Sequence, residues 1–346
     1  MKRQKKKGIQ LTVMFFLLLL GSSVSAGTWV NSGLLVDAET VEQNIDKPDW
    51  VVIDARDLKD YLSGHIPGAI SLGNRAKKAL RDSTARTFHD ISKYETLLGK
   101  AGIDNNTHVV FYHGNMDTLP DASVGFWVLE YLGHDKVYVL DGGIDAWRKA
   151  GKRLDMEPTM KEPKTFTAKV VPSRYATTAE ILEIANGNPK GTQLIDSRTK
   201  KEHEGTDIRA LLGGHVPNTT INVSHLDTLV KVKDPKTDKM KAIEYIDPEK
   251  VAKDFAGLDK NKRTIAYCQT GTRSTLTYLE LRLLGFKEPA NWDESWRVYA
   301  SDFHANNPIA APNGAQYYNF DKVNKSIKKL QKKVAALEKL VAPPKK

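Results

Sequence analysis

The chain contains the same pattern of residues twice, and this internal repeat limits the possible folds more than any other feature. Both 51–72 and 193–223 begin with a short apolar run that ends in Asp-x-Arg and continue to Gly-His-(Ile/Val)-Pro. The matching residues are Asp54, Arg56 and Gly64 to Pro67 in the first copy, and Asp196, Arg198 and Gly214 to Pro217 in the second. The repeat is far longer than the roughly 20 to 50 residues of a solenoid repeat. The sequence therefore predicts a tandem duplication of one domain.

Each copy alternates short apolar runs with stretches of helical pattern. The run at 108–114 in the first copy corresponds to 263–269 in the second, and a predicted helix follows each run. Further along, the comparison aligns Trp147 with Trp296. Alternation of this kind is typical of parallel strands with helices on both faces of the sheet. We therefore expect an α/β fold with two similar domains and a helical C-terminal tail.

Proline residues and composition set the expected boundaries. A charged stretch that contains Pro158, Pro163 and Pro172 separates the two copies and is typical of a linker. The expected organisation is a signal peptide at 1–26, a first domain at 30–152, a linker at 153–173, a second domain at 174–304, and a linker followed by a Lys-rich helix at 305–346.

The first 26 residues have the features of a secretory signal peptide. A cationic start, MKRQKKK, precedes an apolar run from Ile9 to Gly21, and Val24 and Ala26 are the small residues of a cleavage site. The apolar run is shorter than the ~20 residues that a membrane-spanning helix needs; an uncleaved anchor is the alternative. We expect export, most simply to a periplasm, with secretion from the cell as the alternative.

The basic character of the chain belongs to its two ends. The formal net charge is +10, and the predicted signal peptide contributes five basic residues. Residues 321–346 contain nine Lys against Asp321 and Glu338, which leaves a net charge of −2 for the body at 27–320. The high isoelectric point therefore gives no indication of nucleic-acid binding, and we expect none.

Cys268 is the only cysteine of the chain, so no internal disulfide can form. It directly follows the apolar run TIAY, at the predicted carboxyl end of a strand, where open α/β sheets bind their ligands. A short loop then leads into a predicted helix; its residues are Gln269, Thr270, Gly271, Thr272 and Arg273.

Such a loop can bind an anion, because successive backbone N–H groups converge and the helix N-terminus adds positive charge. We predict that Cys268 is held there as a thiolate with a lowered pKa, with Arg273 and Arg198 adding permanent charge. The alternatives are a small buried cysteine without reactivity and arginines with only structural roles.

A thiolate in an anion-binding loop suits two chemistries, phosphate-ester cleavage through a phosphocysteine and sulfur transfer through a persulfide. The cysteine phosphatases place five residues between the cysteine and the arginine, whereas four separate Cys268 from Arg273. The smaller loop favours a single sulfur atom carried on the thiol.

Together these motifs resemble those of the tandem-domain rhodaneses, the thiosulfate sulfurtransferases, of the exported bacterial type. The resemblance covers about 34–150 and 175–300 and rests on Asp-x-Arg, Gly-His-Ile-Pro-Gly, Cys-x-x-Gly-x-Arg-Ser and Asp-Gly-Gly-x-x-x-Trp. It implies two rhodanese-like domains. It also implies that Cys268 bears a persulfide, that 269–273 form the active-site loop, and that Arg198 binds the substrate anion. The loop lacks the Gly-Val-Thr ending of mammalian-type members, which leaves the sulfur donor open.

The resemblance further implies transfer of a sulfane sulfur from a small anionic donor such as thiosulfate to cyanide or a thiol, without a metal or cofactor. A non-enzymatic sulfur carrier or sensor is the alternative, followed by a cysteine phosphatase or arsenate reductase. The first copy has His113 at the cysteine position and cannot form a persulfide. We expect this domain to be inactive and to form one side of the cleft.

The C-terminal tail contains a heptad pattern. Its apolar residues are Val323, Ile327, Leu330, Val334, Leu337 and Val341, with lysines at most other positions. Three interpretations are open for 321–346: self-association into a homo-oligomer, contact with an anionic surface, or a solvated helix. The insertion at 224–245 is expected to form an ordinary solvated hairpin.

Overall fold

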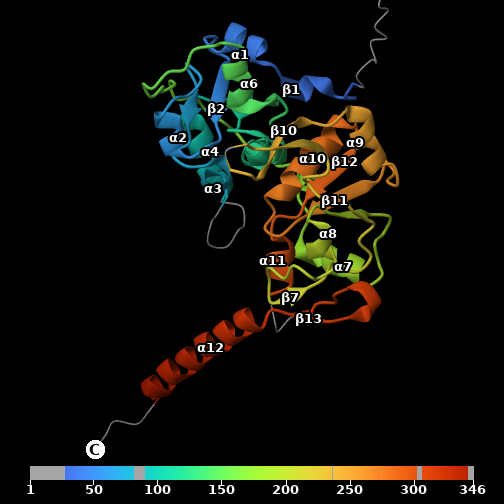
Figure 1. Ribbon diagram of the computed structural model, residues 1–346. Helices are drawn as coiled ribbons and strands as arrows, with labels where there is room; N and C mark the ends of the chain where they lie inside the picture. Colours follow the sequence, from blue (N-terminus) through green and yellow to red (C-terminus); the bar gives the residue numbers. More distant parts are fainter. Residues whose placement is uncertain (1–27, 82–89, 236, 302–305, 342–346) are drawn as a thin grey trace, which may run out of the picture.

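The computed structural model describes residues 28–81, 90–235, 237–301 and 306–341, so the predicted signal peptide lies outside the described residues. Two α/β domains lie side by side, and a long C-terminal helix leaves the second domain (Figure 1). The prediction of two parallel-sheet domains with a helical tail is confirmed. Within the described residues, no helix combines the length and the apolar character needed to cross a membrane.

The first domain is built on a parallel sheet with the strand order β1-β5-β4-β2-β3. Its strands are Leu35–Val36 (β1), Trp50–Asp54 (β2), Ile70–Ser71 (β3), His108–Tyr112 (β4) and Val137–Leu140 (β5). Its helices are Ala38–Asn44 (α1), Leu58–Leu62 (α2), Ala76–Ala79 (α3), Ile91–Lys100 (α4), Leu119–Tyr131 (α5) and Gly143–Lys149 (α6), with 3-10 turns at Ser32–Leu34 (η1) and Met116–Thr118 (η2).

The second domain repeats this plan with the strand order β12-β11-β6-β8, again parallel. Its sheet strands are Gln193–Asp196 (β6), Ile221–Asn222 (β8), Arg263–Tyr267 (β11) and Glu288–Asn291 (β12). Its helices are Thr178–Ala185 (α7), Lys200–His203 (α8), Pro248–Asp254 (α9), Arg273–Leu283 (α10) and Ser295–Tyr299 (α11), with a 3-10 turn at Pro172–Arg174 (η3). Further elements are the pair Leu212–Gly213 (β7) and Tyr317–Tyr318 (β13), the hairpin Leu229–Lys233 (β9) and Met240–Tyr245 (β10), the turn Pro312–Gly314 (η4) and the tail helix Phe320–Val341 (α12).

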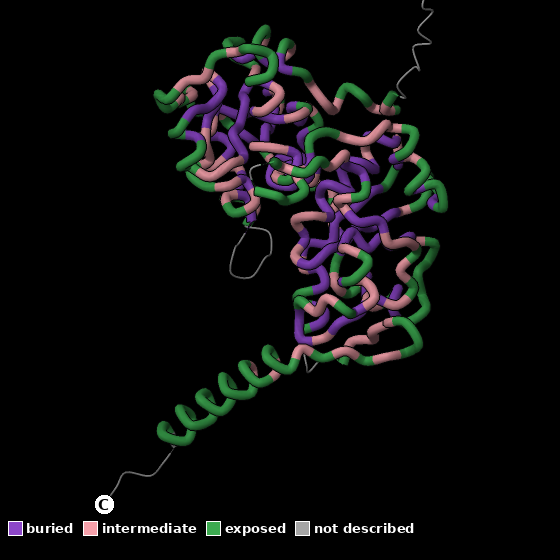
Figure 2. The backbone as a smooth tube through the Cα atoms, in the orientation of Figure 1, coloured by how far each residue is buried: buried purple, intermediate pink, exposed green. Residues whose placement is uncertain are grey.

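The central strands are apolar on both sides because helices cover both faces of each sheet. Along β4, Val109 and Phe111 belong to one core cluster, whereas Val110 and Tyr112 belong to the cluster on the opposite face. Figure 2 shows the buried strands as the interior of each domain. The predicted helix starts are also present, since the side chains of Asp37 and Thr177 accept N–H bonds that cap α1 and α7.

The segment between the domains is packed along the first domain. Asp155 exchanges two backbone hydrogen bonds with His65, at 2.8 and 2.9 Å, and Lys169 N–H donates to the carbonyl of Leu132 at 2.8 Å. The side chain of Phe166 is buried. The stretch that was expected to be a linker is therefore fixed against the first domain by backbone hydrogen bonds and a buried side chain.

The two domains share an apolar interface formed by equivalent helices. Helix α5 follows β4 and α10 follows β11, and one core cluster contains Trp127 of α5 together with Leu276 and Leu279 of α10. Polar contacts hold the same helices, since the hydroxyls of Ser123 and Thr275 lie 2.8 Å apart. This helix pair therefore holds the two domains against each other.

The insertion at 224–245 forms the expected antiparallel hairpin, but its base is not solvated. Ala242 and Leu229 are buried, and Ala242 N–H donates to the carboxylate of Asp117 in the first domain at 3.2 and 3.3 Å. The prediction of a solvated hairpin is therefore wrong for this part of it. The hairpin is a second connection between the domains.

Backbone hydrogen bonds correct one alignment of the two copies. The N–H of Ile144 donates to the carbonyl of His113 at 2.9 Å, and the N–H of Trp296 donates to the carbonyl of Cys268 at 3.0 Å. Ile144, and not Trp147, is therefore the counterpart of Trp296. The strand registers agree with this, because Val109 pairs with Val137 and its counterpart Thr264 pairs with Pro289, which puts Ile144 and Trp296 at the same distance along the two copies.

Candidate functional site

Cys268 lies at the carboxyl end of β11, as the sequence predicts, and α10 begins at Arg273. The thiol is fully buried, but its neighbours in the loop line an open pocket; they are Gln269, Thr270 and Thr272. The N–H of Thr270 donates to the Cys268 Sγ at 3.4 Å. The sulfur therefore lies at the base of a polar loop and accepts a backbone hydrogen bond there.

The surroundings of the thiol favour its ionised form. Burial raises the pKa of the Cys268 thiol, but the charge of Arg273 and hydrogen bonds from Thr270 and Ser274 lower it more, so the net pKa is below the ordinary value. A thiolate is the nucleophilic form of cysteine. The loop thus prepares Cys268 for attack on an electrophilic atom.

The loop is held in one conformation by contacts from the end of β12 and the turn that follows it. Gly271 has a φ of +74°, and an added Cβ would lie 2.3 Å from the carbonyl oxygen of Asp293. The amide of Asn291 donates to the Gly271 carbonyl at 3.2 Å, and the hydroxyl of Ser274 donates to the side-chain oxygen of Asn291 at 2.6 Å. Glycine is therefore required at 271 for both the backbone angle and the close approach.

Ser295 positions Cys268 from the opposite side. Its Oγ accepts the N–H of Cys268 at 3.1 Å and donates to the carbonyl of Trp292 at 2.7 Å. Ser295 has a φ of +52°, which is uncommon for a residue with a side chain, and its counterpart in the first copy is Gly143 with a φ of +58°. The sequence analysis missed this residue, although the replacement of a repeated glycine by serine is a signal it could have used.

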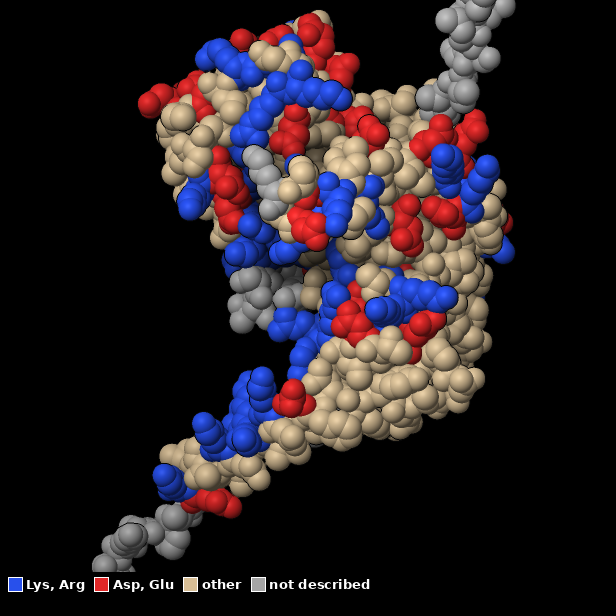
Figure 3. Space-filling model, in the orientation of Figure 1, with Lys and Arg blue, Asp and Glu red and all other residues tan. Residues whose placement is uncertain are grey.

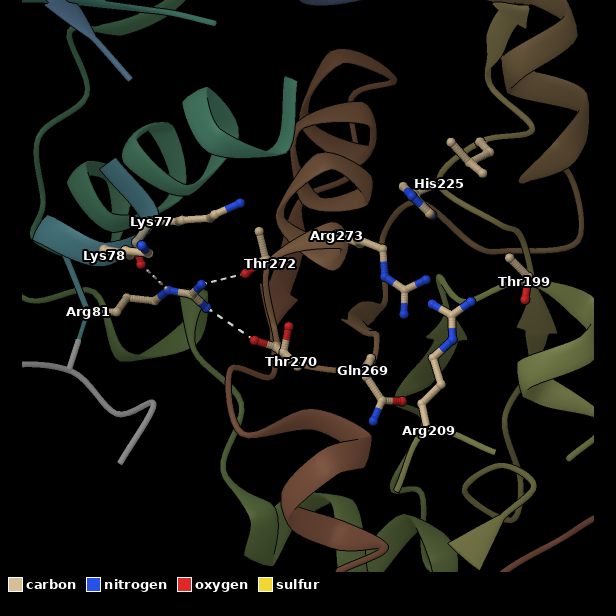
Figure 4. Close-up of a pocket in the computed structure, with 11 residues that line it drawn as sticks. Lys77, Lys78, Arg81, Thr199, Arg209, His225, Gln269, Thr270, Thr272 and Arg273 are labelled. Carbon is tan, nitrogen blue, oxygen red and sulfur yellow. Dashed lines mark hydrogen bonds between the residues drawn. The ribbon is translucent and has the colours of Figure 1, made fainter. Parts of the chain in front are cut away.

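Arg273 is fixed by a buried carboxylate. Its two terminal nitrogens donate to the two oxygens of Glu202 at 2.8 Å each. Glu202 is also 3.6 Å from the guanidinium of Arg209, and Figure 4 shows the Arg273 and Arg209 side chains pointing toward one another. Arg209 also donates to the carboxylate of Asp207 at 2.6 Å, so Glu202 and Asp207 together fix the two guanidinium groups at the pocket.

Arg198 does not line this pocket. Its guanidinium donates to both oxygens of Asp196 at 2.9 and 2.6 Å and to the carbonyl of Gly214 at 2.8 Å, and the side chain is 1% exposed. It also lies over the ring of Trp296, 4.4 Å from the ring centre. The structure places Arg198 as a buried support below the site, because the neighbouring Asp196 in the motif pairs with it.

The first copy contains the same arrangement of the Asp-x-Arg motif. Arg56 donates to Asp54 and to the carbonyl of Gly64 at 2.8 Å, as Arg198 does to Asp196 and Gly214. The shared geometry shows that Asp-x-Arg joins the strand end to the Gly-His-(Ile/Val)-Pro turn in both domains. This assigns the motif to the fold and separates Arg198 from the predicted anion-binding residues.

The pocket beside Cys268 has a volume of about 750 Å³ and is rich in positive charge. It is lined by residues of both domains: Lys77, Lys78 and Arg81 from the first, and Thr199, Arg209, His225, Leu226, Gln269, Thr270, Thr272 and Arg273 from the second. As expected, the first domain forms one side of the cleft. Figure 3 shows Lys and Arg side chains gathered where the two domains meet.

Arg81 connects the first domain directly to the active-site loop (Figure 4). It forms a buried ion pair with Asp293, and it donates to the Thr270 carbonyl at 3.3 Å and to the Thr272 hydroxyl at 2.5 Å. The basic run RAKKALR at 75–81 supplies this residue and both pocket lysines. The sequence analysis missed all three, because a run in one copy gives no sign that it will reach the loop of the other.

The equivalent position in the first domain has no nucleophile. His113 is fully buried, and its Nδ1 lies 2.8 Å from the carbonyl of Asn115. Burial lowers the pKa of His113 to about 4, so the ring is neutral at pH 7. Across the described ranges, no group of three or more His, Cys, Asp or Glu side chains has the geometry to hold a metal ion.

Comparisons with known proteins agree with this geometry. The family model described as "Rhodanese-like domain" matches residues 37–150 and 178–302. The "Putative thiosulfate sulfurtransferase" of Mycobacterium leprae is 33% identical over 280 residues, which cover 78% of this chain and 95% of that protein. A protein of the same name from Haloferax volcanii is 29% identical over 290 residues, covering 78% and 93%.

Solved structures show the same fold. The 3-mercaptopyruvate sulfotransferase SseA from Escherichia coli superposes with a TM-score of 0.62 at 24% identity, covering 76% of this chain and 98% of that one. The anaerobic ergothioneine biosynthesis enzyme from Chlorobium limicola gives a TM-score of 0.69 at 20% identity, covering 82% and 71%. With the family model matching both halves of the chain, the protein belongs to the rhodanese family and carries two rhodanese-like domains.

Proposed function

We propose that this protein is a sulfurtransferase that moves a sulfane sulfur from thiosulfate, or a related anionic donor, through a persulfide on Cys268. The observation that carries the proposal is the placement of the one thiol, with a lowered pKa, in a loop whose residues Gln269, Thr270 and Thr272 line a pocket rich in Lys and Arg. The names of the relatives at 33% identity support thiosulfate as the donor.

In the first half-reaction, the Cys268 thiolate attacks the sulfane sulfur of thiosulfate. A new S–S bond forms to the Sγ while the bond to the sulfonate sulfur breaks, and sulfite leaves with that electron pair. The Thr270 N–H and the Arg273 charge stabilise the anions at the start and the end of this step. The enzyme is left as a Cys268 persulfide.

In the second half-reaction, cyanide or a thiolate attacks the outer sulfur. The persulfide S–S bond breaks, Cys268 regains its electron pair as a thiolate, and thiocyanate or a new persulfide leaves. The pocket of about 750 Å³ is much larger than thiosulfate needs, so a bulkier acceptor can approach the same sulfur. The two separate displacements predict ping-pong kinetics.

Mass spectrometry of the intact protein tests the persulfide. Addition of thiosulfate is expected to increase the mass by one sulfur atom, located on the peptide that contains Cys268, and addition of cyanide is expected to remove it. Sulfate, a dianion without a sulfane sulfur, is the matched control reagent and leaves the mass unchanged. The Cys268→Ser variant is expected to gain no sulfur; an equal gain in that variant would overturn the assignment.

Measurement of steady-state turnover distinguishes a sulfurtransferase from the alternative functions. A carrier or sensor serving one partner protein would gain the sulfur without sustained thiocyanate production, so steady-state turnover with thiosulfate and cyanide favours the enzyme. A cysteine phosphatase or arsenate reductase would instead act on an aryl phosphate or on arsenate. The loop of four residues between Cys268 and Arg273 speaks against both.

We also propose that residues 1–26 direct export and are then removed. The cationic start, the short apolar run and the small residues Val24 and Ala26 support this. Terminal sequencing of protein recovered outside the cytoplasm is expected to begin at Gly27. Recovery of the full chain in the cytoplasmic fraction would contradict the proposal.

A further inference from the structure

Helix α12 extends from the second domain and is attached to it only at its start (Figure 1). The N–H of Asn319 donates to the Leu211 carbonyl at 2.9 Å, and its side chain donates to the Ile208 carbonyl at 2.9 Å. Lys322 donates to the carbonyl of Arg209. Among the described residues, nothing in α12 beyond Lys322 makes a side-chain hydrogen bond or ion pair with another element. The rest of the helix is therefore held by no polar side-chain contact from another described element.

This free helix carries a narrow apolar stripe. Ile327, Leu330, Val334 and Leu337 are 47%, 53%, 52% and 62% exposed. They recur at steps of three and four, which places them on one face of a helix. A soluble helix that packs on a core has a wider apolar face, whereas a stripe confined to two heptad positions is the seam of a coiled coil.

We propose that α12 pairs in parallel with α12 of a second copy of this chain, forming a two-stranded coiled coil. The types of residue at the seam indicate how many helices associate and in which direction they run. Beyond the first turn, which carries Phe320 at a and Val323 at d, Leu330 and Leu337 take the d positions and the a positions are Ile327, Val334 and Val341, which are all β-branched. β-Branched residues at a with Leu at d favour parallel dimers over higher assemblies.

The charges of α12 fit the same partner. Lys325, Lys332 and Lys339 occupy the f positions, directly opposite the seam, so the lysines of two paired helices point away from each other. Figure 3 shows lysines along α12 beside a surface free of charge. The flanking positions complement one another, because Lys333 at g faces Glu338 at e of the second copy in a parallel pair.

A membrane surface fits these observations less well. An interfacial helix inserts a broad face with large apolar residues, flanked by cations. Between Ile327 and Leu340 the exposed large apolar residues lie at the seam except for Leu340, and Glu338 borders the seam, where an anionic lipid surface would repel the carboxylate. The seam from Ile327 to Val341 extends about 22 Å at 1.5 Å per residue.

The test measures the mass of the purified protein by light scattering or sedimentation over a series of concentrations. The mass is expected to approach twice that of one chain. A Leu330→Asp and Leu337→Asp variant places charge in the seam and is expected to remain monomeric with unchanged turnover. The matched control, Lys325→Asp with Lys332→Asp, puts the same residue on the outer face and is expected to retain the doubled mass.

The parallel direction of the two paired helices is tested by introducing a cysteine into the seam. Leu337→Cys in a Cys268→Ser background places two thiols next to each other in a parallel pair and is expected to form a disulfide-linked dimer on oxidation. In an antiparallel pair centred on the seam, residue 337 faces residue 327, and the thiols are about 15 Å apart. A single-chain mass for the unmodified protein, equal masses for seam and outer-face variants, or co-sedimentation of a monomer with anionic vesicles would each overturn the proposal.

Discussion

Among single residues, Arg273 has the most direct influence on the reactivity of the thiol. Its charge lowers the pKa of Cys268, so its removal raises that pKa and leaves less thiolate at a given pH. For Arg273→Gln we expect the acidic limb of the kcat/KM profile to move to higher pH. At neutral pH we expect a fall of about 100-fold, the usual cost of losing one charge-stabilising donor.

The measurement is kcat/KM with thiosulfate and cyanide from pH 5 to 9. Arg273→Lys keeps the positive charge and is expected to retain most of the wild-type pH profile, although it loses the paired bonds to Glu202. Arg297→Gln, an exposed arginine on α11, is the control and should leave the profile unchanged. A fall in rate for Arg273→Gln without a change in the profile would mean that Arg273 has only a structural role.

How far the site could be predicted differs from residue to residue. The position of Cys268 and its loop follow from a strand, a glycine and a helix start that are adjacent in sequence. Arg198 could not be placed in this way, because its direction depends on whether the guanidinium turns to the pocket or back to Asp196. The carboxylate two residues away, in a buried setting, decides this in favour of the ion pair.

At the scale of elements, α10 carries an unusual group on its buried side. Glu280 is fully buried, and burial raises its pKa to about 8, against an ordinary value of 4.5. The Thr228 hydroxyl donates to one of its oxygens at 2.5 Å, while the other oxygen has no partner among the described residues. The carboxyl is therefore protonated in the folded protein at neutral pH.

Because the pKa of Glu280 is raised by folding, this residue destabilises the protein as pH rises. The cost is absent below about pH 4.5, grows by about 1.4 kcal/mol for each pH unit above it, and levels off above about pH 8. We expect Glu280→Gln to unfold at a higher urea concentration than wild type at pH 8 and at nearly the same concentration at pH 5. The control Glu288→Gln, at an exposed site on β12, should show no such pH dependence.

A stability difference between Glu280→Gln and wild type that is the same at both pH values would contradict this interpretation of the helix interior.

The elements themselves were largely predictable, since the apolar runs at 108–112 and 263–267 are continuous and lie between clear turn residues. The alignment of Trp147 with Trp296 was wrong because the shared tryptophan was given more weight than the spacing from the preceding strand, so that Trp147 was matched in place of Ile144. The strand registers and the hydrogen bonds to His113 and Cys268 reveal the correct alignment.

For the whole molecule, the contact of Arg81 with the active-site loop makes the first domain part of the site. Arg81→Ala leaves Asp293 buried without its guanidinium, and breaking a buried pair in this way costs about 3–5 kcal/mol. We expect a lower unfolding midpoint in urea and a higher KM for thiosulfate. Arg75→Ala removes a partly exposed ion pair with Asp57 and is expected to cost about 1 kcal/mol or less, with KM unchanged.

Equal effects of Arg81→Ala and Arg75→Ala on KM would show that the first domain does not influence the loop.

The duplication itself was predictable from the sequence, because the two copies share whole motifs. The way the copies face each other was not, since it depends on the hairpin at Ala242 and on a helix pair that buries apolar residues from both domains. Neither contact leaves a pattern within a single copy.

The pairing of α5 with α10 affects whether the site stays assembled when the protein is dilute. The helices are equivalent elements of two copies, so the contact resembles the self-complementary interface of a twofold dimer. Here one covalent chain supplies both halves, and a tether of this kind gives an effective concentration on the order of millimolar. The catalytic cleft should therefore survive dilution that would dissociate two separate subunits.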